Sequence, residues 1–109
     1  MALPHASPGQ AIDVRPLGAA LPQHKTTALF KAGDLEVMRL VLPAGRSLPV
    51  HQVAGEITVQ CIEGVLDVTV EGTSHRLQAG ELLYLAGGVP HGVTALQDAS
   101  ALVTVALRR

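Results

Sequence analysis

Two stretches of similar pattern decide the fold of this chain, Gly45-Arg-Ser-Leu-Pro-Val-His51 and Gly80-Glu-Leu-Leu-Tyr-Leu-Ala-Gly-Gly-Val-Pro-His91. Each begins at a glycine suited to a turn, continues through an apolar run and ends at a single histidine. Between them, Gly55-Glu-Ile-Thr-Val-Gln-Cys-Ile-Glu-Gly64 has the composition of a strand closed by a Glu-Gly turn. Separate strands that each deliver one histidine favour a β domain in which His51 and His91 converge on an interior site.

The runs on either side of these stretches alternate with a period of two, as half-buried strands do. Leu66, Val68 and Val70 share one side of such a run, and turn signals such as Glu71-Gly72 end it. No run combines a sustained apolar period of 3.6 residues with helix caps. The sequence therefore predicts an all-β, antiparallel sandwich or barrel. The expected strands include Thr26–Phe30, Leu35–Leu42, Ile57–Ile62, Val65–Val70, Leu82–Leu85, Val93–Leu96 and Ala101–Leu107.

The first part of the chain differs from the rest in composition. Residues 1–25 contain four prolines, which disfavour regular hydrogen-bonded structure, so we expect a proline-rich, extended N-terminal segment. Within it, Ala11-Ile-Asp-Val14 is the candidate for a short edge strand. Residues 26–109 are expected to form the single β domain.

The overall composition suggests a surface that is partly covered in the assembled protein. Hydrophobic residues make up 48% of the chain and charged residues 16%, while aromatic residues contribute only 2%. The core must therefore be aliphatic, and few polar groups remain to cover the outside. We expect part of the outer surface to be buried against a second copy in a homodimer.

The charge and the cysteine content of the chain limit the classes of partner that we expect for this protein. A net charge of −1 and the lack of basic clusters give no electrostatic case for binding nucleic acid or a membrane surface. The first residues lack a signal-peptide pattern, and no apolar run is long enough to span a bilayer. The single cysteine, Cys61, has no internal disulfide partner. A cytoplasmic protein with a small-molecule partner is the expectation.

The two histidine stretches resemble the two signature motifs of the cupin family, of the small single-domain kind, over about residues 35–107. The resemblance implies an antiparallel jelly-roll, or double-stranded β-helix, barrel for residues 26–109. The positions that match are Gly45, His51 and Gly64 in the first motif, and Gly80, Gly88 and His91 in the second.

This chain differs from the family motifs at the positions of metal ligands that the family commonly uses. Val53 stands at the position of the second metal histidine, and Ile57 stands at the position of the metal glutamate. Ala86 and Ala95 replace the proline and asparagine of the second motif. The resemblance therefore implies a degenerate metal site, since only His51 and His91 carry over as ligands.

Glu56 is the candidate for a third ligand. With two histidines it would complete the ligand set common to non-haem iron sites, for one divalent iron, manganese, nickel or zinc ion. Strand alternation, however, places Glu56 and Ile57 on opposite faces, so Glu56 turns inward only if Gly55 hosts a bulge. Alternation therefore favours a Glu56 side chain on the polar face of the strand, away from the interior.

These residues lead to three hypotheses. In the first, Ile57, Val59 and Cys61 line an apolar pocket, and His51 and His91 fix a small organic ligand or a weak metal at its polar end. In the second, the chain is a metal-dependent oxygenase or isomerase of the cupin kind. In the third, it is a structural or interaction barrel without a pocket. Because one fold hosts many activities, resemblance does not decide whether the chain is an enzyme.

Overall fold

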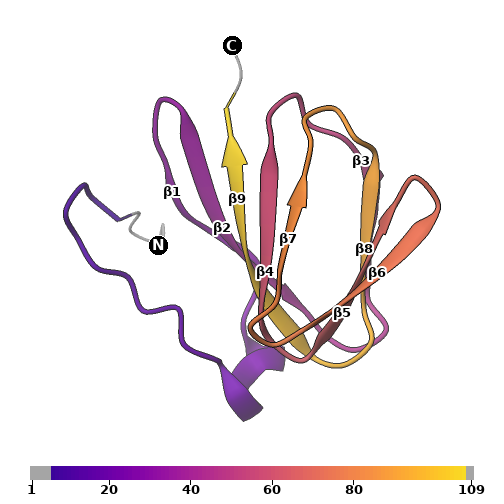
Figure 1. Ribbon diagram of the computed structural model, residues 1–109. Helices are drawn as coiled ribbons and strands as arrows, with labels where there is room; N and C mark the ends of the chain where they lie inside the picture. The colour runs from indigo at the N-terminus through magenta and orange to yellow at the C-terminus, as the bar shows by residue number, and fades with distance from the viewer. Residues whose placement is uncertain (1–5, 108–109) are drawn as a thin grey trace.

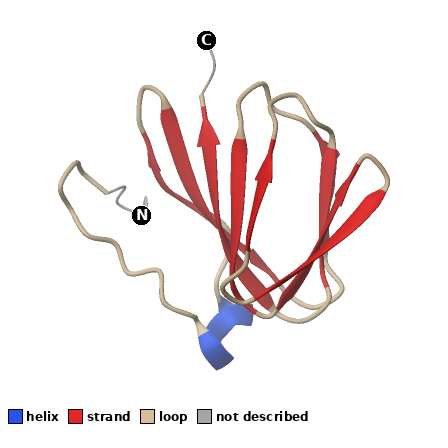
Figure 2. Ribbon diagram, viewed as in Figure 1, coloured by secondary structure: helices blue, strands red, loops and turns tan. Residues whose placement is uncertain are grey.

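The computed structural model describes residues 6–107, which form nine β-strands and one short 3₁₀-helix (Figure 2). The prediction of an all-β chain is confirmed. No helix in this part of the chain is long and apolar enough to cross a membrane. The elements are η1 (Gly18–Gln23), β1 (Thr27–Lys31), β2 (Leu35–Leu42), β3 (Ser47–His51), β4 (Ile57–Glu63), β5 (Val65–Val70), β6 (Thr73–Gln78), β7 (Leu82–Leu85), β8 (His91–Ala95) and β9 (Ala99–Ala106).

The strands form two antiparallel sheets that face each other (Figure 1). One has five strands in the order β1-β2-β9-β4-β7, and the other has four in the order β3-β8-β5-β6. The expected closed barrel is corrected in one respect: within residues 6–107 no ladder joins the two sheets into a continuous cylinder. The edge strands are β1 and β7 in one sheet and β3 and β6 in the other, and no backbone ladder among the described residues pairs an edge of one sheet with an edge of the other. The chain crosses between the sheets at Gly64, where it leaves β4 and enters β5.

The inner faces of the two sheets make an aliphatic core. Alternate residues point inward, including Val59 and Cys61 from β4 and Leu66 and Val68 from β5, all of them buried. Burial of aliphatic surface of this kind stabilises the fold at about 25 cal/mol per Å². The period of two seen in the sequence therefore corresponds to an inner and an outer face, as predicted.

A bulge interrupts this alternation near the end of β4. Cys61 pairs with Ala101 of β9, but Glu63 pairs with the next residue, Ser100, so Ile62 has no partner of its own. An extra residue of this kind shifts the following side chain to the other face of the sheet. Glu63 consequently lies on the outer face of the five-stranded sheet, away from the core.

Glu63 anchors the N-terminal segment to that outer face. Its carboxylate accepts hydrogen bonds from the backbone N–H groups of Leu17 and Gly18, at 2.9 and 3.0 Å, and from the Ser100 hydroxyl. Arg39 of β2, only 8% exposed, lies 3.6 Å from the same carboxylate and donates to the Arg15 carbonyl. These contacts fix the chain just before η1.

The segment ahead of this anchor contains no regular element. Residues 11–14 form no strand, so the expected edge strand is wrong. Asp13 instead bonds within its own neighbourhood, to the backbone and side chain of Arg15, and this local turn competes with strand pairing. In Figure 1 this part of the chain, in indigo, arches away from β1 before it reaches η1.

Protonation of Glu63 is expected to release the anchor. Partial burial raises the pKa of Glu63, but hydrogen bonds from Ser100 and the backbone, with the charge of Arg39, outweigh it and lower the pKa below 4.5. Because the folded pKa is lowered, this stabilisation is complete above the unfolded pKa and is lost as pH falls through the folded pKa. Glu63→Gln should lower the free energy of unfolding at pH 7 by about 1–3 kcal/mol.

The measurement is urea unfolding between pH 3 and pH 7. The loss caused by Glu63→Gln should shrink as the pH falls, because protonation of the wild-type carboxyl removes the same charge. Glu71→Gln, at an exposed turn position, is the control and should change little at either pH. An equal loss for Glu63→Gln at both ends of the range would contradict the assignment.

Gly64 is expected to tolerate no side chain. Its φ of +75° is left-handed, and a Cβ there would lie 2.0 Å from the Asp98 carbonyl oxygen. Gly72 is the matched control, since its φ is +80° but a Cβ would meet nothing within 4 Å. Thermal or urea unfolding should show a loss of about 1 kcal/mol for Gly72→Ala and clearly more for Gly64→Ala. Equal losses would mean that the tight crossing at Gly64 does not limit stability.

Candidate functional site

A cavity of about 380 Å³ lies between the two sheets. Its walls are mainly aliphatic side chains from the inner faces, among them Ile57 and Val59 of β4 and Val103 and Val105 of β9. They face inward because each occupies an alternate position of a strand that pairs on both sides. The cavity therefore has the size and lining of a site for a small organic molecule.

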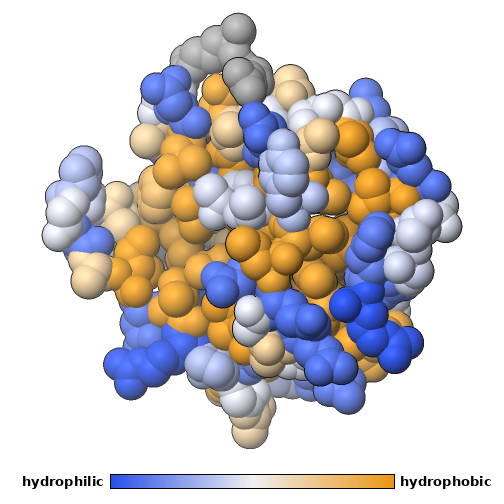
Figure 3. Space-filling view, viewed as in Figure 1, coloured by the Kyte–Doolittle hydropathy of each residue, from blue (hydrophilic) through white to orange (hydrophobic). Residues whose placement is uncertain are grey.

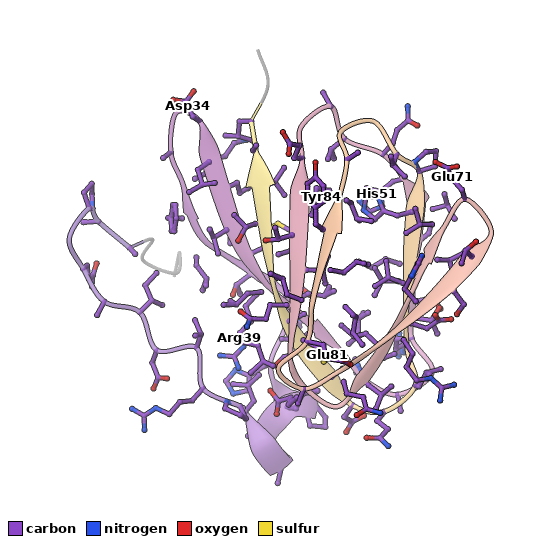
Figure 4. All side chains as sticks on the ribbon, in the orientation of Figure 1. Asp34, Arg39, His51, Glu71, Glu81 and Tyr84 are labelled. Carbon is purple, nitrogen blue, oxygen red and sulfur yellow. The ribbon has the colours of Figure 1, made fainter. Side chains whose placement is uncertain are left out.

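Two histidines form one polar side of the cavity. His51 ends β3, His91 begins β8, and the two residues are direct partners in the antiparallel ladder. Their ring centroids are 4.5 Å apart, with the planes tilted by 54°. His91 is buried at 5% exposure, whereas His51, labelled in Figure 4, is exposed and also lines the cavity. The predicted convergence of the two strands is therefore what the structure shows.

Backbone carbonyls orient both rings. His51 Nδ1 is 3.2 Å from the Pro49 carbonyl oxygen, and His91 Nδ1 is 3.0 Å from that of Val89. Because a carbonyl oxygen only accepts, each Nδ1 must carry the hydrogen. In the neutral form the lone pair of each ring is then on Nε2. The histidine side of the cavity therefore offers two hydrogen-bond acceptors, or two ligand atoms.

Cys61 does not line the cavity, although the sequence placed it there. It is fully buried in the core, and its thiol lies 3.4 Å from the Glu63 carbonyl and 3.6 Å from that of Gly64. Burial raises the pKa of the Cys61 thiol, with a further contribution from nearby acidic side chains. Cys61 packs in the core cluster on the same inner face as Ile57 and Val59, but it does not line the cavity. Cys61 is thus a core residue with a protonated thiol.

Glu56 lies outside the cavity. The Tyr84 hydroxyl donates a 2.9 Å hydrogen bond to its carboxylate on the outer face, and this bond raises the pKa of Tyr84. No bulge at Gly55 turns it inward, because Gly55 is packed against the Ala106 carbonyl and the Ala106 N–H donates to the Glu56 carbonyl. Strand alternation therefore directs the Glu56 side chain away from the cavity.

The donor atoms at the cavity do not fit a resident divalent ion. Val53 and Ile57, at the two remaining ligand positions of the family motif, both line the cavity and carry no donor atom. Among residues 6–107 no three histidine, cysteine, aspartate or glutamate side chains gather as a metal site. The donors that remain are the imidazoles of His51 and His91 and the carboxylate of Glu36, and these three do not gather around one point as the three protein ligands of a catalytic zinc site do.

Sequence reasoning missed the contribution of β2. Glu36 and Met38 line the cavity, beside Leu40 from the same strand. The period of two along Leu35–Leu42 contained the signal, since Glu36 shares a face with the buried Leu40 and Leu42. A glutamate within an apolar run is normally assigned to solvent, which is why the pattern did not single it out.

The fold consists of two facing β-sheets, and the two motif histidines lie on the paired strands β3 and β8 of one sheet. These features are those of a cupin domain. The Cupin domain family matches residues 38–107, and the chain belongs to this family. The predicted resemblance is thereby confirmed. No curated protein matches the chain significantly.

Solved structures share the fold. A conserved protein of unknown function from Streptococcus pyogenes is 18% identical with a TM-score of 0.76, over 100% of this chain and 99% of that chain. An RmlC-like cupin from Desulfovibrio desulfuricans is 24% identical with a TM-score of 0.75, over 89% and 97%. A variant of salicylate 1,2-dioxygenase from Pseudoaminobacter salicylatoxidans is 21% identical with a TM-score of 0.64, over 66% of this chain and 21% of the enzyme. At these identities the likeness concerns the fold alone.

Restoring the missing donors should create a metal site. Val53→His with Ile57→Glu adds an imidazole and a carboxylate to a cavity that already presents His51 and His91. The affinity for Ni²⁺ or Zn²⁺, measured by calorimetry after chelation, should rise by at least about tenfold. Val50→His with Leu82→Glu places the same groups at exposed positions and is the control. Equal affinities in the two double variants would mean that the four positions do not converge.

Proposed function

We propose that this protein binds a small, largely apolar organic molecule in the cavity between its sheets, with His51 and His91 as hydrogen-bonding groups at one side. The observation that carries the proposal is the aliphatic cavity of about 380 Å³ with two imidazoles on its wall. On this proposal the two facing sheets act as the jelly-roll barrel of the family, and the interior is the binding site.

In this proposal the aliphatic walls supply the affinity for the ligand, and the two histidines orient it. The aliphatic walls remove apolar ligand surface from water, which contributes about 25 cal/mol per Å². The histidines contribute orientation, because their rings are fixed by the carbonyls of Pro49 and Val89. Pockets of this kind generally combine apolar walls with a few fixed polar groups.

A metal-dependent oxygenase or isomerase finds no support in the donor set. The two family positions that would complete it are the aliphatic Val53 and Ile57, and Glu56 bonds to Tyr84 on the opposite face. Binding, rather than metal-dependent turnover, is therefore the function that we propose.

A homodimer belongs to the same proposal. Leu82 and Tyr84 are 60% and 61% exposed on the outer face of β7. Figure 3 shows apolar side chains gathered across the middle of the viewed face, over the position of β4 and β7. Exposed apolar side chains gathered in this way support burial against a second copy.

Filling the cavity should abolish binding. Val103→Phe adds an aromatic ring to the β9 wall, and 2-phenylethanol serves as a neutral apolar probe. We expect the wild type to bind the probe in a saturable, one-to-one manner by calorimetry or NMR titration, and Val103→Phe to weaken it by at least about tenfold. Leu82→Phe adds the same ring on the outer face and should leave binding unchanged. Undiminished binding by Val103→Phe would place the probe elsewhere and refute the proposal.

A further inference from the structure

The polar side chains of the cavity are all hydrogen-bond acceptors when the imidazoles are neutral. Of the described residues that line it, only His51, His91 and Glu36 carry polar side-chain groups other than the weakly polar sulfur of Met38. No lysine, arginine, serine, threonine, tyrosine, asparagine or glutamine belongs to the lining. The side chains therefore offer no strong hydrogen-bond donor to a ligand once the imidazoles are neutral.

The histidines are acceptors because of the bonds that orient them. Each Nδ1 hydrogen is donated to a backbone carbonyl, of Pro49 for His51 and of Val89 for His91. The remaining ring nitrogen, Nε2, presents a lone pair in the neutral ring. Reversing this tautomer would place two acceptors against each other at Nδ1 and would cost a hydrogen bond on each ring.

Glu36 adds a negative charge to the same cavity. It lies on the inner face of β2, opposite Val105 of β9, and is partly buried. Its carboxylate makes no hydrogen bond or ion pair with another described residue. Lys31, the cross-strand partner on β1, is exposed, lies outside the cavity lining and is not within ion-pair distance. With neutral imidazoles, the lining side chains carry a formal charge of −1 from Glu36.

We propose that the ligand of this cavity is an apolar primary amine, bound as the ammonium form. This inference rests on the binding function proposed above and names its ligand class. The ammonium pairs with the Glu36 carboxylate, and the apolar body occupies the aliphatic interior. An ammonium has three donors and no acceptor, so its chemistry complements a lining of acceptors.

A carboxylate ligand is disfavoured for the same reasons. It would bring a second negative charge into a partly buried, low-dielectric space beside Glu36, where like charges repel more strongly than in water. It would also face the two lone pairs of the histidines without a proton to share. The expected affinity of a neutral alcohol lies between those of the amine and the carboxylate, because the alcohol donates one hydrogen bond and carries no charge.

The test compares three probes of matched shape: 2-phenylethylamine, 2-phenylethanol and 3-phenylpropionate. Calorimetry measures the three affinities at pH 8 in one buffer. We expect the amine to bind most tightly and the carboxylate at least about tenfold more weakly than the amine. The amine affinity should also fall with added salt, whereas that of the alcohol should not.

The variant that isolates the charge is Glu36→Gln. It should lower the amine affinity by about tenfold and remove its salt dependence. Glu56→Gln is the matched control, because it removes the same charge on the outer face of the same sheet. It should leave the affinities for all three probes unchanged.

The outcomes separate this inference from the binding function. A carboxylate that binds as tightly as the amine, or an amine affinity that is insensitive to Glu36→Gln and to salt, overturns the amine assignment and leaves the cavity as a binding site. If the wild type binds none of the three probes, both proposals fail. If Glu36→Gln does not fold, the salt dependence and the order of the three affinities in the wild type still decide the assignment.

Discussion

The alternation of side chains along β4 is the constraint on which the rest of the structure depends. The strand lies between β9 and β7, so its register is fixed by hydrogen bonds on both sides. Ile57 and Val59 therefore point into the cavity, while Glu56 points to the outer face and bonds to Tyr84. A shift by one residue would exchange the two sets and place a carboxylate beside the histidines. The site is thus aliphatic because alternation along β4 turns Ile57 and Val59, rather than Glu56, toward the cavity.

The bulge at the far end of β4 gives the same strand a second role. By uninterrupted alternation Glu63 would face the core, where an unpaired carboxylate is costly. The extra residue moves it to the outer face, where Arg39, Ser100 and two backbone N–H groups satisfy it. The bulge therefore protects the core and fastens the segment before η1 to the sheet. One strand holds both the cavity wall and the anchor of the N-terminal segment.

Several elements were predictable because the signal is local. Apolar alternation identified the strands around Leu35–Leu42 and Val65–Val70. The glycine-to-histidine stretches placed His51 and His91 on separate strands, and the structure pairs these strands. The strand Thr73–Gln78 escaped prediction, because an edge strand can be polar on both faces. The edge strand expected at residues 11–14 does not form, since alternation over four residues is too short to outweigh local hydrogen bonds of Asp13.

The sequence by itself determined the fold class, the family and the two histidines, because these depend on short-range periodicity and on motif spacing. It also determined that the ligand positions held by Val53 and Ile57 lack donors. The tertiary structure alone decided that Cys61 lies in the core, that Glu63 is an anchor and that Glu36 joins the site. These outcomes depend on where a bulge falls and on which distant strands pair, and such long-range register is set by the packing of the whole domain rather than by any local stretch.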